Sequence, residues 1–310
     1  MDSFVDRFAA MGTQVEIMVV DSEPVLLARA RDRVAELEHR WSRFLPDSEV
    51  SRLNAAEGET LTVSSATILL LTRAAEGYEL TRGRFDPYQL DALERVGYRT
   101  TFAEVGRPMV EAPAPDVPDA SGRVRLPVVD VDSGRVSLPR GLRFDPGGIG
   151  KGLAADLVAA ELRAAGAAGV CVNIGGDVRV AGTSPDEGGW VVAIRDRESD
   201  APVARLAVSE GGIATTSRSR RQWEAADGIR YHHVIDPATG TSAPTPVVFA
   251  TAVASEAWQA EVLSKVAFLD RNAGIEFAES LGATAMVATA DSVITGRGWS
   301  RYERTMQDAR

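Results

Sequence analysis

A stretch of nine residues, 144–152, gathers one acid, four glycines and one lysine immediately before a predicted helix. Glycine lets backbone N–H groups approach a ligand closely, because no Cβ stands in the way. The first amides of a helix lack partners within the helix, and the helix dipole favours an anion there. Lys151 adds a formal positive charge at the same place. The residue types therefore predict a site for a phosphate or a pyrophosphate.

The same pattern also occurs as a plain tight connection between two elements, and that interpretation stays open at this point. Two common nucleotide-binding motifs are excluded. A P-loop needs glycine where Asp145 stands, and Ser or Thr where Gly152 follows the lysine. No G-x-G-x-x-G can be written across 144–152, so a Rossmann dehydrogenase is disfavoured as well.

The overall composition is that of a globular protein, with 45% hydrophobic and 25% charged residues among 310. The formal net charge of −10 argues against general nucleic-acid binding. A polyanionic ligand would therefore have to be held by local backbone donors, by one or two cations or by a metal. The lone Cys171 excludes an internal disulfide, and three histidines leave no Cys/His zinc cluster.

The N-terminal residues hold two acids among the first seven and no apolar run of signal-peptide length. No stretch approaches the ~18 apolar residues that a transmembrane helix needs. We therefore expect no membrane association and a cytoplasmic protein.

Periodicity predicts the elements that must position these residues. Alternating or continuous apolar residues predict several strands, and apolar residues three and four apart predict helices. The strands include 14–20, 170–174, 178–181, 190–194, 205–208, 247–253 and 283–288; the helices are 27–44, a segment capped by Ser64 or Ser65 that reaches Tyr78, 153–164 and 256–269.

The order of these elements indicates the fold class. Strands and helices do not alternate strictly, and several strand pairs read as hairpins, including one over 128–138. This favours an α+β fold with mainly antiparallel sheets and packed helices over a doubly wound parallel sheet. The length fits one domain, with two intimately packed subdomains as the alternative. Four prolines at 106–119 predict a surface excursion.

Other polar residues near turns have two interpretations each. His232 and His233 precede an Asp-Pro-x-Thr-Gly turn, where they are either structural or engaged in ligand contact or proton transfer. A basic cluster is either a solvated face or a phosphate clamp. Each acid beside a Gly/Pro turn or at a helix start is either a cap or a site residue. The basic cluster consists of Arg218, Arg220 and Arg221, and the acids are Asp86, Asp145, Asp177 and Glu261.

Seven short segments, in order along the chain, resemble the motifs of the ApbE-type FAD:protein FMN transferases. Each segment is weak by itself, whereas seven in register are specific. They are Met-Gly-Thr at 11–13; Phe44 with Asp-Ser-Glu at 47–49 and Ser51 to Asn54; Phe-Asp-Pro at 85–87; the run from Asp145 to Asp156; Asn-x-Gly-Gly-Asp at 173–177; Ala-Thr-Thr at 214–216; and His-x-x-Asp-Pro-x-Thr-Gly at 233–240.

The resemblance implies an ApbE-like, T-fold-related architecture and a transferase. Such proteins bind FAD, cleave its pyrophosphate with the help of Mg²⁺, release AMP and attach FMN to a threonine hydroxyl of a target flavoprotein. Carried over by position, the FAD contacts would be Met11, Phe44, Arg84, Phe85, Asp86, Asp145, Lys151 and Ile235. The metal would lie against the carbonyl of Gly148 and the carboxylate of Glu261, and His233 would orient or deprotonate the acceptor.

One departure from the family pattern bears on the metal. The family has an acid and a threonine one helical turn apart, whereas this chain has Glu261 and Lys265. An ammonium has no acceptor for a cation to bind. We therefore expect Lys265 to pair with Glu261 and to make any Mg²⁺ dependence weak or absent. A second departure, Thr-Ser-Arg at 216–218 where the family usually has Ser-Gly, affects the expected recognition of the acceptor. An FAD-binding protein, or an FAD pyrophosphatase without protein flavinylation, is the alternative function.

Overall fold

The computed structural model describes residues 1–101, 126–195, 201–219, 221–224 and 228–304. The chain falls into two compact units. The first unit comprises 1–36, 151–219 and 246–310, and the second comprises 37–150 and 220–245. Whether the chain is one domain or two packed subdomains stays a prediction. The surface excursion expected at 106–119 lies outside the described residues.

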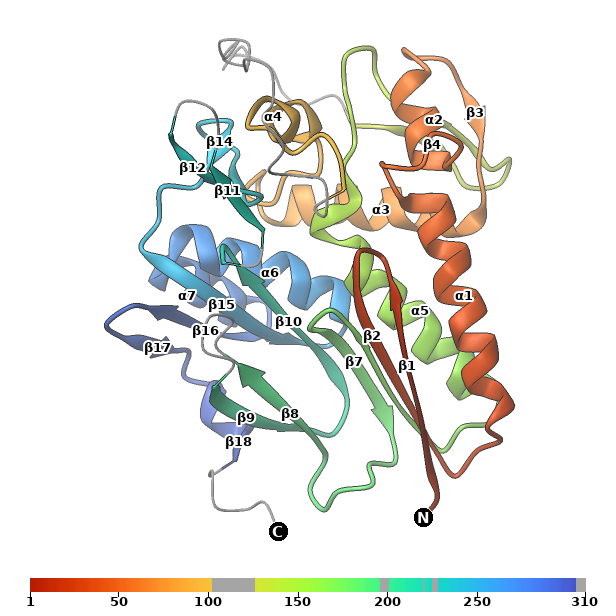
Figure 1. The fold of residues 1–310 in the computed structure, drawn as a ribbon, viewed down its shortest axis with the longest axis vertical. Coiled ribbons are helices and arrows are strands. Elements are labelled where there is room, and N and C mark those ends of the chain that lie inside the picture. Colours follow the sequence, from red (N-terminus) through yellow and green to blue (C-terminus); the bar gives the residue numbers. More distant parts are fainter. Residues whose placement is uncertain (102–125, 196–200, 220, 225–227, 305–310) are drawn as a thin grey trace. The chain divides into compact units, whose positions relative to one another are not determined.

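The first unit is built on an eight-stranded sheet in which every neighbouring pair is antiparallel (Figure 1). The predicted α+β class with mainly antiparallel strands is confirmed. In spatial order the strands are β1 (Ser3–Ala10), β2 (Thr13–Val20), β6 (Gly169–Ile174), β7 (Asp177–Gly182), β10 (Gly211–Ser217), β15 (Val247–Ala254), β16 (Thr284–Thr289) and β17 (Val293–Thr295).

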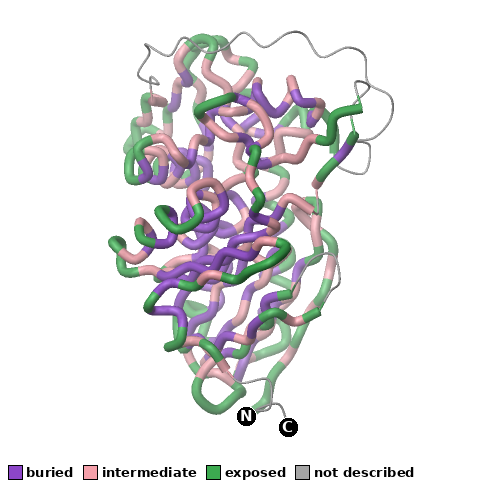
Figure 2. Tube along the Cα trace, turned by 90° about the vertical axis from the view of Figure 1, so that its left-hand side faces the viewer, coloured by how far each residue is buried: buried purple, intermediate pink, exposed green. Residues whose placement is uncertain are grey.

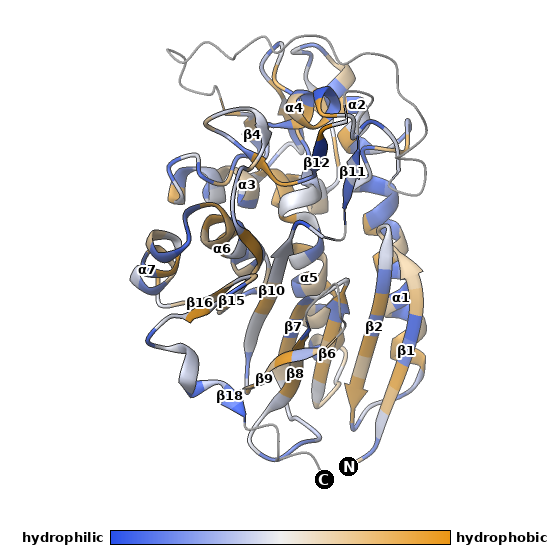
Figure 3. Cartoon of the chain, turned by 60° about the vertical axis from the view of Figure 1, so that its left-hand side comes forward, coloured by the Kyte–Doolittle hydropathy of each residue, from blue (hydrophilic) through white to orange (hydrophobic). Residues whose placement is uncertain are grey.

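Both faces of this sheet are covered, which explains why its central strands are nearly continuous apolar runs. One face packs against a three-stranded sheet made of β8 (Trp190–Arg195), β9 (Pro202–Val208) and β18 (Glu303–Arg304). Ile213 and Phe249 of the large sheet join Leu206 of β9 in that core. Figure 2 shows the buried strands of the sheet, and Figure 3 colours β15 and β16 as hydrophobic.

The opposite face packs against helices. In Figure 1, α5 (Gly150–Ala164) and α6 (Ala257–Asp270) lie on the same side of the sheet. Residues that alternate with Ile213 along β10 point toward α6, and Thr216 forms a 2.7 Å hydrogen bond with Ser264. Helix α7 (Asn272–Ser280) follows α6 directly and packs against it. None of the helices that the structure describes combines the length and apolar character that a bilayer crossing requires.

Within its described residues, the second unit has three α-helices of its own and three small antiparallel sheets. The helices are α2 (Glu49–Ala55), α3 (Ser65–Leu80) and α4 (Leu90–Arg95). Ser48 and Ser64 cap α2 and α3 by accepting hydrogen bonds from backbone amides three residues on. The sheets are β3–β5–β4 (Leu61–Thr62, Arg135–Ser137, Val128–Asp130), β11–β12 (Gln222–Glu224, Arg230–His232) and β13–β14 (Ile235–Asp236, Thr241–Ser242). The hairpin predicted over 128–138 is confirmed by the pairing of β4 with β5.

The first long helix is shorter than the sequence predicts. Helix α1 (Val25–Trp41) ends three residues before the predicted end at residue 44. A residue that precedes proline is disfavoured in the helical region, and Pro46 imposes this on Leu45. The chain instead turns, with the amide of Leu45 donating to the Ser42 carbonyl at 3.3 Å. Phe44, which the sequence placed on the apolar face of the helix, therefore lies in this turn.

Candidate functional site

The glycine-rich segment forms a short turn followed by a helix. Residues Pro146–Gly148 make one 3₁₀ turn, which Asp145 caps by accepting a hydrogen bond from the Gly147 amide at 3.2 Å. Gly147 is exposed and Gly148 half-buried, whereas Ile149 and Gly150 are buried. The segment is therefore open to solvent at its turn and closed at the start of α5.

The structure explains why position 152 needs a glycine, which the sequence did not predict. A Cβ at this position would lie 2.5 Å from the backbone oxygen of Ala257, at the start of α6. The amide of Gly152 donates to Oε2 of Glu261 at 2.8 Å. The glycine thus permits the close approach of two backbones, and its N–H is satisfied by a carboxylate of this chain.

Lys151 lies between two buried acids rather than alone. Its Nζ contacts Oδ2 of Asp177 and lies 2.9 Å from Oε1 of Glu261. The carboxylates of Asp177 and Glu261 are 4% and 2% exposed, so neither can exchange this partner for bulk water. Lys265 adds a second ammonium 3.7 Å from the same Glu261 oxygen, one helical turn along α6. The predicted pairing of Lys265 with Glu261 is confirmed. We call these four residues the lysine–carboxylate cluster.

Mutual charge sets the protonation states in this cluster. Burial opposes the charged form of Lys151, but the carboxylates of Asp177 and Glu261 raise its pKa to about 12. Burial also opposes the charge on Glu261, yet the two ammonium groups and the Gly152 amide lower its pKa. For Asp177, burial is the larger effect and its pKa is raised despite Lys151. Lys151 is therefore a fixed positive charge at neutral pH.

A third acid, half-buried, fixes the start of α6. Asp156 on α5 accepts hydrogen bonds from the amides of Ala257 and Trp258, each at 2.9 Å. Arg179 on β7 lies 3.4 Å from the same carboxylate. Burial raises the pKa of Asp156 to about 7, although the amides and Arg179 oppose this shift. By holding the first turn of α6, Asp156 sets where Glu261 meets Lys151.

Met11, a predicted FAD contact, occupies a strained position in the first unit. It stands in the tight turn between β1 and β2 with φ 52°, followed by Gly12 with φ 65°. Such a turn prefers asparagine or glycine first, and a left-handed side-chain residue costs about 1 kcal/mol or more. The turn abuts Gly175, where a Cβ would lie 2.5 Å from Oγ1 of Thr13. The backbone conformation at position 11 therefore does not by itself favour methionine.

In the second unit, two of the predicted residues, Phe44 and Asp145, meet around one arginine. The guanidinium of Arg43 stacks 4.2 Å from the Phe44 ring and 4.6 Å from the Tyr98 ring. Its Nε lies 2.9 Å from Oδ1 of Asp145. Phe44 also packs against a buried cluster that contains Ile235 and Trp223. We call Arg43, Phe44, Tyr98, Trp223 and Asp145 the arginine–aromatic cluster.

The remaining predicted contacts of the second unit lie in an ion pair and in the core. Arg84 donates to Oδ1 of Asp236 at 2.8 Å, in the turn that follows Ile235. Phe85 is only 3% exposed, so its ring is part of the packing. Asp86 accepts hydrogen bonds from the Tyr88 amide and from Gln89, and burial raises its pKa.

The two histidines have different surroundings. Both ring nitrogens of His232 are engaged: Nδ1 accepts from the Val234 amide at 3.3 Å, and Nε2 lies 3.1 Å from the carbonyl of Ala243. This assigns His232 the tautomer with the proton on Nε2 and a structural role. The amide of His233 donates to the Arg221 carbonyl at 3.2 Å. Its role in proton transfer stays a prediction.

Sequence reasoning left Asp177 as either a cap or a site residue, and it missed Arg43, Tyr98 and Trp223 as members of these clusters. Asp177 ends the Asn-x-Gly-Gly-Asp segment, so a signal for it existed in the motif itself. Nothing local marks the others, because Trp223 reaches Tyr98 across more than a hundred residues of chain, with ring centroids 5.7 Å apart. Gly148 and Glu261, the expected metal ligands, belong to different units, and their joint role stays a prediction.

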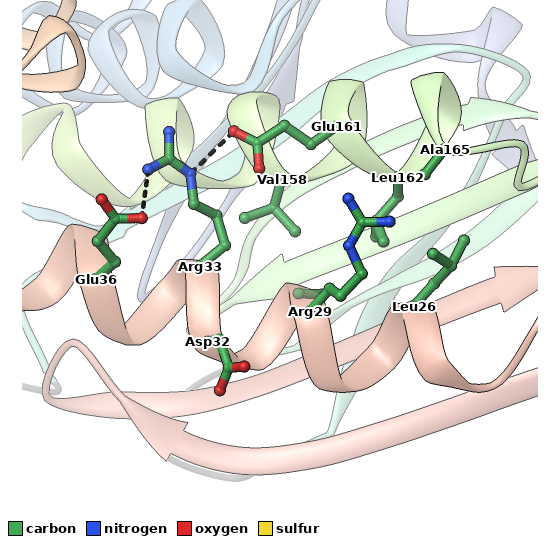
Figure 4. A pocket seen from close by; sticks show the side chains of 10 residues that line it. Leu26, Arg29, Asp32, Arg33, Glu36, Val158, Glu161, Leu162 and Ala165 are labelled. Atoms are coloured by element: carbon green, nitrogen blue, oxygen red, sulfur yellow. Dashed lines mark hydrogen bonds and ion pairs between the residues drawn. The ribbon is translucent and has the colours of Figure 1, made fainter.

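A groove of about 300 Å³ between α1 and α5 contains none of the predicted site residues (Figure 4). Arg33 bridges Glu36 and Glu161 across it, at 2.8 and 2.9 Å. Its floor is apolar, with Leu26, Val158 and Leu162 among the lining residues.

The family model and the relatives described below all indicate the ApbE family. The model of the ApbE family matches residues 11–287. An FAD:protein FMN transferase of Vibrio cholerae is 27% identical over 263 residues, which cover 82% of this chain and 77% of the relative. One of Rhodobacter capsulatus is 30% identical over 246 residues, covering 76% of this chain and 45% of the relative.

Solved structures agree with the fold. The ApbE protein of Thermotoga maritima superposes with a TM-score of 0.84 at 25% identity, covering 98% of this chain and all of that one (100%). The flavin transferase ApbE of Vibrio cholerae gives a TM-score of 0.79 at 22% identity, covering 97% and 99%. The expected ApbE-like architecture is confirmed.

Proposed function

This chain belongs to the ApbE family, whose model covers residues 11–287, and from that premise we propose that it transfers FMN from FAD to a protein. Curated relatives along most of the chain are FAD:protein FMN transferases. The observation that carries the proposal is family membership, supported by Lys151, which follows the glycine-rich segment in sequence and is positively charged at neutral pH. The acceptor is a flavoprotein with a target threonine.

The reaction is a substitution at phosphorus. The threonine oxygen forms a bond to the FMN phosphorus of FAD while the bond to the bridging oxygen breaks, and AMP leaves with that electron pair. Negative charge grows on the phosphoryl oxygens, so positive charge and N–H donors are what the site must supply. The hydroxyl proton must pass to a base, for which His233 is the candidate.

Lys151 is suited to stabilise the growing charge. An ammonium has three donors, and Asp177 and Glu261 use two of them. The third can donate to a phosphate oxygen, while the two acids hold the ammonium in a fixed direction. On this proposal the carboxylates orient the lysine and do not contact FAD themselves.

The residues around Glu261 do not fit Mg²⁺. Oε1 of Glu261 is already shared by Lys151 and Lys265, and Oε2 accepts from the Gly152 amide. The four side chains of the lysine–carboxylate cluster carry two positive and two negative charges, so they offer no net attraction to a divalent cation. Among the described residues, no group of three or more His, Cys, Asp or Glu side chains could hold a metal ion. We derive no step through a metal and propose that Lys265 supplies positive charge in its place.

Lys265→Thr tests this directly. Removing the ammonium leaves the cluster with one excess negative charge, so Mg²⁺ should raise the melting temperature of the variant but not that of the natural protein. Activity in EDTA should persist for the natural protein. A natural protein that is stabilised by Mg²⁺, or inactive without it, would overturn the metal-free assignment while leaving the transfer reaction in place.

The transfer reaction itself is tested by mass spectrometry. The protein is incubated with FAD and the flavin-carrying domain of a flavoprotein from the same genome, and the domain is then weighed. A gain of one FMN, lost when the acceptor threonine is changed to alanine, supports transfer. Release of AMP and FMN without labelling indicates an FAD pyrophosphatase, and binding without turnover indicates an FAD-binding protein. The cytoplasmic location stays a prediction, which fractionation of the native cells would test.

A further inference from the structure

Arg43 is a nearly inaccessible cation whose partners are all specific. Its side chain is 5% exposed. The guanidinium carbon lies over the Phe44 and Tyr98 rings, 4.2 and 4.6 Å from their centroids, and these two rings adjoin each other with centroids 5.8 Å apart. The guanidinium nitrogens donate to Oδ1 of Asp145 and, at 2.9 Å, to the Tyr98 carbonyl. A planar, delocalised cation suits such a stack, whereas a lysine could not fill it. Every part of this side chain is therefore used.

The partners of Arg43 are the residues on which FAD binding is expected to depend. Phe44 and Asp145 are both predicted FAD contacts, and they lie a hundred residues apart in the sequence. The second carboxylate oxygen of Asp145 accepts a hydrogen bond from the Gly147 amide. Arg43 and that amide together therefore fix the direction of the carboxylate. Without Arg43, an uncompensated negative charge would remain at the head of the glycine-rich turn, where it would repel a polyanion.

We propose that Arg43 is a positioning residue for the flavin dinucleotide, acting through Asp145, whose charge it neutralises and whose carboxylate it holds in place. The proposal rests on the function proposed above. Because Arg43 acts on the residues that receive FAD and not on the reacting atoms, its loss should weaken binding and leave the chemical step nearly unchanged.

The experiment measures FAD affinity by quenching of flavin fluorescence, without any acceptor, and then KM and kcat of transfer. Arg43→Met should weaken FAD binding about tenfold and raise KM correspondingly, with kcat within about threefold. Arg43→Lys keeps the charge but not the stack, so its affinity should lie between the two. In an Asp145→Asn background, Arg43→Met should change affinity by less than about twofold, because the partner it acts through is gone.

Arg33→Met is the matched control. Arg33 also holds two ion pairs and is 21% exposed, yet it contacts no predicted FAD residue. Its FAD affinity should equal that of the natural protein. Melting temperatures of all variants show which fraction is folded, and Arg43→Lys remains informative if Arg43→Met does not fold.

The outcomes separate the two proposals. A natural protein that does not bind FAD ends the proposed function. A natural protein that binds FAD, with Arg43→Met weakened equally in both backgrounds, altered in kcat alone or unaffected, ends the role of Arg43 only.

Discussion

The lysine–carboxylate cluster of the first unit and the arginine–aromatic cluster of the second both hold a cation away from water, with different partners. Lys151 faces two carboxylates that are almost fully buried. Arg43 faces two aromatic rings and a single carboxylate. In the first cluster, carboxylates compensate the charge of Lys151. In the second, two aromatic rings form much of the environment of the Arg43 guanidinium.

The difference follows from the shapes of the two cations. An ammonium is a compact point charge with three donors, so it can hold two acids and still reach a ligand. A guanidinium is flat and delocalised, so it can lie over neighbouring aromatic rings while its N–H groups hold one carboxylate in a fixed direction. These shapes suit the proposed roles, in which Lys151 acts on the substrate and Arg43 holds other residues in place.

The largest effect is expected when the first cluster loses its central cation. Lys151→Met leaves two buried carboxylates with only the more distant Lys265 ammonium, so the free energy of unfolding should fall by about 3–5 kcal/mol. Urea unfolding measures this. The triple variant Lys151→Met, Asp177→Asn, Glu261→Gln should recover much of the stability, since no buried charge is then left unpaired. Equal losses in the single and triple variants would show that packing, and not charge, dominates the cluster.

A smaller effect is expected from the backbone contact that sets the cluster's geometry. Gly152→Ala places a Cβ 2.5 Å from the Ala257 carbonyl, so α5 and α6 must move apart. We expect a loss of about 1–3 kcal/mol in the free energy of unfolding. Gly150→Ala, in the same helical turn, meets its nearest atom at 3.4 Å and is the control. It should change stability by less than 1 kcal/mol in either direction, and equal effects of the two variants would contradict the assigned role of Gly152.

The sequence predicts those parts of the molecule whose pattern is local. The pairing of Glu261 with Lys265 follows from helical spacing alone, and the position of α6 follows from its apolar residues. The contact of Lys151 with Glu261 could not be predicted, because it depends on how α5 docks against α6. Strand β1 was missed since its outward face carries Val5, Arg7 and Ala9, which break the expected alternation at a sheet edge. Arg43 was missed because two of its partners, Tyr98 and Asp145, come from distant segments of the chain.

The smallest predicted effect concerns Glu49, whose carboxylate is stabilised by different partners from those of the acids in the first unit. In the second unit Glu49 accepts hydrogen bonds from Ser64 and Thr67 and pairs with Arg40 at 2.8 Å. Burial opposes its charge, but these donors lower its pKa below the usual 4.5. A lowered pKa in the folded state contributes stability above pH 4.5, and that stability is lost as the pH falls through the folded pKa. In the first unit, the lowered pKa of Glu261 and the raised pKa of Asp177 act in opposite directions.

Glu49→Gln should therefore lower the free energy of unfolding by about 1 kcal/mol at neutral pH. The gap between this variant and the natural protein should be full above pH 4.5 and should close as the pH falls from there through the lowered folded pKa, because the natural protein loses the contribution of the ionised carboxylate. Urea unfolding at a series of pH values measures the gap. A gap that stays constant with pH would mean that Glu49 acts through its hydrogen-bond geometry alone. The hydroxyl donors around Glu49 would then not favour its ionised form, whereas the ammonium groups of the first unit favour that of Glu261.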